Sequence, residues 1–111
     1  MHCGLLPKYA GLNAPFWSML NQDRLLGVTI HLMDEDFDSG AILAQVSIRN
    51  HQKTYLATLD VLFSEGQELL ESVLSDSTQF TPVEQDCSER TYFSSPSRAD
   101  VKEFLCKGLK L

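Results

Sequence analysis

An apolar segment near the start of the chain, from Gly27 to Met33, constrains the fold more than any other feature of the sequence. Its β-branched residues alternate between two faces, as they do in an extended strand. One face carries Val28, Ile30 and Leu32, and the other carries Thr29, His31 and Met33. Because both faces are mostly apolar, the pattern predicts an internal strand that is covered on both sides.

Two further elements are predicted on either side of this strand. The apolar cluster from Ala14 to Leu20 is typical of a short buried helix with Pro15 in its first turn. Alternation over residues 41–49 predicts a second strand. The polar residues 34–40 between the two strands predict a loop. Residues 1–13 contain several Gly and Pro residues and are also predicted to form a loop.

A long helix and a short strand are predicted next. Thr54 is placed to cap a helix that extends to about Leu74, with apolar residues at near-helical spacing. Gly66 interrupts this pattern with the weakest helix former apart from proline. Residues 80–83 predict an edge strand, since Pro82 cannot donate a hydrogen bond to a neighbouring strand.

The last predicted element is a helix from about Arg98 to Lys107. Ser97 and Asp100 have the spacing of its N-cap and N3 residues. The order of elements is typical of an α/β fold, an open sheet with flanking helices. Because the chain opens on a loop where such a sheet would already have a strand, we expect that strand upstream and treat residues 1–111 as one partial domain.

The charge balance limits the partners that the chain can bind. Nine basic residues stand against fifteen acidic ones, a net charge of −6, and residues 54–89 contain no Lys or Arg. Nucleic acids and anionic membranes attract clustered basic residues, so neither partner is expected. No apolar run is long enough to span a bilayer and no signal peptide is evident, which predicts a cytoplasmic protein.

The three cysteines, Cys3, Cys87 and Cys106, are far apart and odd in number, so we interpret them as free thiols. Cys3 is the exception to consider, because it adjoins His2 and a neighbouring imidazolium lowers the pKa of a thiol.

The loop after the first strand carries four carboxylates, Asp34, Glu35, Asp36 and Asp38. The simplest interpretation is a solvated turn. The alternating aspartates also match the start of a calcium loop, although Ser39 and Gln45 stand where such a loop needs Gly and Glu. No metal ligand is therefore assigned.

Each histidine has an ordinary structural interpretation when taken alone. His2 is expected to be a frayed terminal residue, and His31 a packed core histidine that bonds a neighbour. His51, in a polar turn near Lys53, is expected to be exposed to solvent.

Three motifs together resemble the folate-dependent formyltransferase family, in its order and spacing. They are residues 2–21, which begin His-Cys-Gly-Leu-Leu-Pro, then Gly27 to Asp34, then Asp38 to Gln45. The resemblance covers residues 2 to 48 as core motifs, with a helical and tail segment over residues 54–111. It is strongest to the methionyl-tRNA and sugar N-formyltransferases, and it implies the C-terminal half of their catalytic domain without the N-terminal Rossmann-like strands.

The resemblance implies a site and a donor. The catalytic residues that it assigns are His2 and Asp38, and the family's asparagine would precede Met1. Formyl transfer from 10-formyltetrahydrofolate passes through a tetrahedral intermediate with a charged oxygen, which His2 would stabilise by donating a hydrogen bond. Asp38 would orient the imidazole and relay the proton lost by the attacking amine. The loop implied to receive the folate comprises Asp34, Glu35, Asp36, Phe37 and Asp38.

The implied reaction is formyl transfer to an amine, which we expect to be a small molecule such as an amino sugar. The implied partners are the folate co-substrate, that acceptor and either a second copy or a complementing N-terminal segment. The alternative hypotheses are a non-catalytic remnant that acts as a folded or oligomeric binding module, and a metal-binding module that uses the acidic loop.

Overall fold

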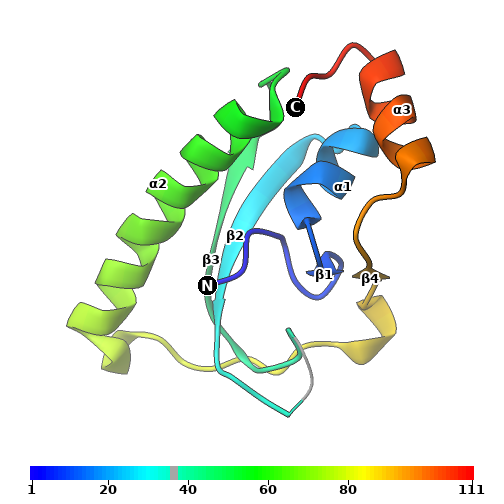
Figure 1. Cartoon of the computed structure of the whole chain (residues 1–111). Helices are drawn as coiled ribbons and strands as arrows, with labels where there is room; N and C mark the ends of the chain where they lie inside the picture. The colour runs from blue at the N-terminus through cyan, green and yellow to red at the C-terminus, as the bar shows by residue number, and fades with distance from the viewer. Residues whose placement is uncertain (36–37) are drawn as a thin grey trace.

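Two antiparallel strands, β2 (Leu25–His31) and β3 (Ile42–Arg49), form the centre of the fold (Figure 1). The computed structural model describes residues 1–35 and 38–111. The strands pair from Leu25 opposite Arg49 to His31 opposite Ile42. The predicted first strand is confirmed, but it begins two residues earlier, at Leu25, and ends two residues earlier, at His31. Met33, which was predicted to end the strand, lies beyond it and is 97% exposed.

The first strand is internal, as predicted. β3 lies along one edge of β2, and an isolated antiparallel bridge joins His2 to Thr29 at the other edge. Residues 26–30 of β2 are buried. The predicted α/β class is confirmed, with a two-residue parallel pairing of β1 (Ala10–Gly11) and β4 (Tyr92–Phe93) as a second small sheet.

Within the described residues, three α-helices pack around this centre. Figure 1 shows α2 (Tyr55–Ser75) along the central strands, and α1 (Ala14–Leu20) beside α3 (Arg98–Cys106). The buried core that they share comprises Phe16, Met19, Leu20, Leu26, Val28, Leu62, Phe104 and Leu109. All three predicted helices are confirmed to within about one residue at each end.

Gly66 allows α2 to approach the sheet closely. A Cβ atom at this position would lie 2.6 Å from the Met1 sulfur and 3.0 Å from a methyl carbon of Val28. The glycine that weakens the helical pattern is therefore needed for packing.

Two local predictions are wrong. Thr54 occupies the N-cap position of α2, but its side chain makes no capping hydrogen bond. Instead the start of α2 is held by the C-terminus, since the Tyr55 N–H donates to the Lys110 carbonyl at 2.6 Å. The edge strand predicted over residues 80–83 is reduced to a single bridge between Val83 and Ile42.

The first thirteen residues and the tail contain short elements that were not predicted. Residues 1–13 were predicted to be loop throughout, yet Ala10 and Gly11 pair with residues about eighty positions away. The tail contains two 3-10 turns, η1 (Ser77–Gln79) and η2 (Cys87–Glu89). The capping box of α3 is confirmed, with Ser97 and Asp100 bonded in both directions.

None of the helices formed by residues 1–35 and 38–111 has the length and apolar character needed to cross a bilayer.

We predict that Phe104→Ala lowers the free energy of unfolding by about 3–5 kcal/mol, because it leaves a cavity in the core. Phe104 has no exposed surface and stacks on Phe16 with ring centroids 4.6 Å apart. The matched control is Leu105→Ala, whose side chain is 51% exposed and whose loss should change stability by no more than about 0.5 kcal/mol. Urea denaturation measures both, and equal effects would contradict the proposed core.

Candidate active site

His2 is fixed to the edge of β2 by backbone hydrogen bonds. Its N–H donates to the Thr29 carbonyl, and its carbonyl accepts from the Thr29 N–H, both at 2.8 Å. The buried Thr29 hydroxyl donates to the Gly4 carbonyl at 2.7 Å, and it accepts from the Leu6 N–H and from Gln45 Nε2. The expectation that His2 is frayed is therefore wrong, because a buried hydroxyl joins the first residues to the sheet.

The imidazole of His2 lies between two acceptors. Its Nε2 is 2.5 Å from the Tyr9 carbonyl oxygen, and its Nδ1 is 3.3 Å from Oδ1 of Asp38. The His2 and Asp38 side chains are only 11% and 17% exposed. Since both oxygens only accept hydrogen bonds, a ring protonated at both nitrogens satisfies both contacts. The structure thus brings together the two residues that the sequence assigns to catalysis.

Asp38 is held in an unusual conformation. Its φ of 58° lies in the left-handed region, where residues other than glycine are uncommon and often functional. Its Oδ2 accepts a hydrogen bond from the Gly11 N–H at 2.9 Å, and its Oδ1 is 3.7 Å from His31 Nε2. The Asp38 carboxylate therefore contacts two imidazoles, those of His2 and His31, through Oδ1 and a backbone N–H through Oδ2.

The side chain of Gln85 holds the turn that presents Asp38. Its Nε2 donates to the Asp38 carbonyl at 2.8 Å and to the Gly40 carbonyl at 2.7 Å. Gly40 tolerates no side chain, because a Cβ atom there would lie 1.7 Å from the Leu32 carbonyl oxygen. Gln85 lies between η1 and η2, so the tail of the chain contributes directly to this turn.

The other members of the predicted folate loop are not brought to His2 where the structure describes them. Asp34 and Glu35 are exposed, and the Asp34 carboxylate accepts a hydrogen bond from the Glu35 N–H at 2.7 Å. Asp36 and Phe37 lie outside the described residues. Over residues 1–35 and 38–111, no three His, Cys, Asp or Glu side chains gather as a metal site would require.

A cavity of about 310 Å³ opens beside His2. It is lined by Cys3 and Gly11 and by apolar side chains of α2, among them Leu59 and Phe63. Burial raises the pKa of the Cys3 thiol, and the nearby N-terminal charge opposes this only in part. The interpretation of Cys3 as a free thiol agrees with the structure, and its raised pKa does not favour a reactive thiolate.

Two residues of the site were not assigned to it from the sequence. His31 was predicted to be a packed core histidine that bonds a neighbour; it is only partly buried, with Nδ1 2.8 Å from the Leu32 carbonyl, and its Nε2 faces Asp38. The signal was its place at the end of a strand, where α/β folds carry their sites. Gln85 had no local signal, because it reaches Asp38 across 47 residues. The predicted exposure of His51 is confirmed.

Comparison with known sequences identifies relatives along most of the chain. The model of the formyl transferase family matches residues 1–74. A methionyl-tRNA formyltransferase of Helicobacter acinonychis is 36% identical over 101 residues, which cover 90% of this chain and 33% of the relative. A methionyl-tRNA formyltransferase of Synechococcus is 38% identical and covers 83% of this chain and 30% of the relative. The chain thus spans about a third of the length of these curated relatives.

Solved structures of formyltransferases share the fold. An N-formyltransferase of Helicobacter canadensis, in complex with folinic acid and dTDP-3-aminofucose, matches with a TM-score of 0.77 and 27% identity, over 89% of this chain and 37% of that one. A formyltransferase of Anoxybacillus kamchatkensis matches in fold with a TM-score of 0.76 at 23% identity, over 95% and 55% of the two chains. The sequence match, the shared fold and the paired His2 and Asp38 agree, and this chain belongs to the formyl transferase family.

Proposed function

We propose that this chain carries the formyl-transfer site of a folate-dependent formyltransferase. The observation that carries the proposal is the contact of His2 with Asp38, at 3.3 Å, in a chain of this family. In the reaction, the amine of the acceptor attacks the formyl carbon of 10-formyltetrahydrofolate, and the carbonyl electrons move to oxygen. Collapse of this intermediate breaks the bond to N10 of the folate, which leaves with a proton.

Asp38 and His2 divide the proton and charge chemistry between them in this proposal. Asp38 takes the proton that the attacking amine loses, directly or through a water, as a positioned general base. His2 donates a hydrogen bond to the charged oxygen of the intermediate. Because its Nε2 faces the Tyr9 carbonyl in the structure, this donation requires the ring to exchange that carbonyl for the oxygen.

The folate donor is proposed to lie against the loop from Asp34 to Asp38, with Asp36 and Phe37 included. Support comes from the Helicobacter canadensis structure, which holds folinic acid and shares 27% of its matched residues with this chain. The amine acceptor is proposed to be a small molecule such as an amino sugar. That structure also holds dTDP-3-aminofucose, and this chain has only nine basic residues against fifteen acidic ones.

The acceptor class is tested by comparing two substrates under the same conditions. The two substrates are a nucleotide-linked amino sugar and methionyl-tRNA, because the matched curated relatives are named for methionyl-tRNA. A higher kcat/KM for the tRNA would contradict the small-molecule acceptor while leaving formyl transfer in place.

We predict that the chain binds folinic acid with saturable heat in a calorimetric titration. The control ligand is p-aminobenzoyl-glutamate, which lacks the pterin and should bind much more weakly. An absence of heat at millimolar folinic acid would contradict a folate site on these residues. That result would favour the alternative, a folded module without catalysis.

We predict that Asp38→Asn lowers the rate of formyl transfer by about a hundred- to ten-thousand-fold, the usual contribution of a general base. The amide preserves the shape of the side chain but cannot take the proton. Glu68→Gln is the matched control, because Glu68 is an exposed carboxylate of α2 outside the proposed site and should retain the wild-type rate. An unchanged rate in Asp38→Asn would remove Asp38 from the mechanism.

We predict that Gln85→Met lowers formyl transfer by roughly tenfold or more, because loss of the amide releases the Asp38 and Gly40 carbonyls. Gln79→Met replaces an exposed glutamine of the same tail and serves as the control. The readout is kcat alongside the affinity for folinic acid. A positioning role requires that kcat falls by more than the loss of folded protein explains. Urea denaturation of both variants measures the folded fraction.

A further inference from the structure

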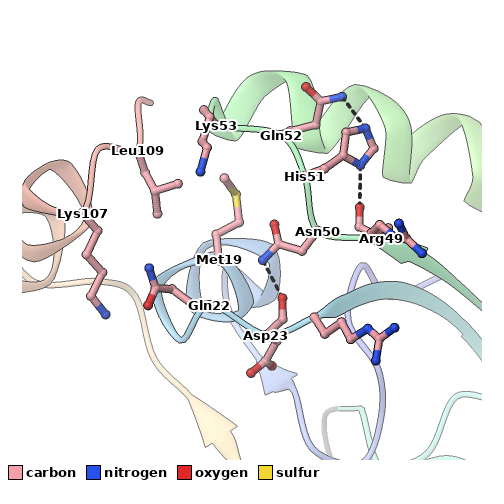
Figure 2. A pocket seen from close by; sticks show the side chains of 11 residues that line it. Met19, Gln22, Asp23, Arg49, Asn50, His51, Gln52, Lys53, Lys107 and Leu109 are labelled. Carbon is pink, nitrogen blue, oxygen red and sulfur yellow. Dashed lines mark hydrogen bonds between the residues drawn. The ribbon is translucent and has the colours of Figure 1, made fainter.

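A second cavity, of about 400 Å³, lies at the end of the β2 and β3 pair that is remote from His2 (Figure 2). It is formed where the turn after α1, the end of β3, the connection to α2 and the residues after α3 meet. Met19 and Leu109 are the apolar residues of its lining, and Figure 2 shows Leu109 between Lys107 and Lys53.

The rim of this cavity gathers basic side chains in an acidic protein. Four of the nine basic residues line it, namely Arg24, Arg49, Lys53 and Lys107. The side chains of Arg24, Arg49 and Lys53 form no ion pair or hydrogen bond with the residues that the structure describes. Lys107 is occupied, since its Nζ donates to the Leu20 carbonyl at 2.7 Å and lies 3.4 Å from Glu103.

The one acidic residue of the lining does not neutralise these cations. The carboxylate of Asp23 accepts a hydrogen bond from the Tyr9 hydroxyl and lies 3.8 Å from Lys8 Nζ, outside the cavity lining. Arg24, Arg49 and Lys53 are exposed and line one cavity, so an anion bound there would be attracted by all three.

Backbone contacts hold the rim in place. The Asn50 N–H donates to the Arg24 carbonyl at 3.0 Å, and Asn50 Nδ2 donates to the Asp23 carbonyl at 2.7 Å. The Lys53 carbonyl accepts from the Lys110 N–H at 2.8 Å. Segments from three parts of the sequence are therefore joined, so that a ligand does not have to order them.

We propose that this cavity binds a small phosphate-bearing ligand, with Arg24, Arg49 and Lys53 as the residues that recognise it. Guanidinium groups donate in pairs to phosphate oxygens, and a lysine ammonium adds a point charge. The site is separate from the formyl-transfer site. Arg49 pairs with Leu25 and Ile42 with His31, so six residue steps along β2, about 20 Å, separate the two ends. The inference therefore does not rest on the proposed function.

The test is a calorimetric titration of the 111-residue chain with pyrophosphate, accompanied by backbone NMR. We expect saturable binding with shifts concentrated in residues 22–24, 49–53 and 107–109. The double variant Arg49→Gln/Lys53→Gln should weaken this binding by about tenfold or more, since it removes two charge-assisted contacts. Far-UV circular dichroism checks that the variants fold. The single variant Arg24→Gln should also weaken the binding of pyrophosphate.

The matched control is Arg98→Gln/Lys102→Gln, which removes two exposed cations of α3 that do not line the cavity and changes the net charge equally. It should bind pyrophosphate as the wild type does. Equal weakening in both double variants, or shifts spread over the whole surface, would show only general attraction and overturn the site. Citrate binding as tightly as pyrophosphate would overturn the preference for phosphate.

Discussion

The buried hydroxyl of Thr29 is the contact on which the arrangement of the site depends. Thr29 has no exposed surface, and its hydroxyl donates one hydrogen bond and accepts two, so its bonding capacity is used in full. Together with the backbone bridge to His2, it adds the first residues of the chain to the edge of β2. The backbone of His2 is thereby joined to the sheet by two hydrogen bonds, and its imidazole contacts the Tyr9 carbonyl.

Asp38 shows how distant contacts support a locally unfavourable conformation. A left-handed aspartate costs free energy by itself. The Gly11 N–H holds its carboxylate, and the Gln85 amide holds its carbonyl. The carboxylate therefore meets His2 and His31 at a defined place, which is what positioned acid–base chemistry requires.

The two ends of the central strand pair carry opposite chemistry. Near His31 lies a carboxylate between two imidazoles, whereas Arg49 lies near Arg24 and Lys53, and these three cations form no ion pair with the described residues. In a chain with a net charge of −6, this separation concentrates positive potential at one end of the sheet. The paired strands separate the two groups by about 20 Å.

The sequence by itself determined most of the longer elements of secondary structure and proposed two residues of the site. Apolar periodicity predicted β2, β3 and the helices, and the spacing of Ser97 and Asp100 predicted the start of α3, because each signal lies within a few residues. The motif resemblance singled out His2 and Asp38. Only the tertiary structure decided the pairing of β1 with β4, the role of Gln85, the approach of His31 to Asp38 and the gathering of cations around the second cavity. Most of these contacts join residues far apart in the sequence, and all of them depend on how the elements pack, for which local periodicity carries no signal. The missing cap at Thr54 has the same cause, since the C-terminal residues hold the start of α2 instead.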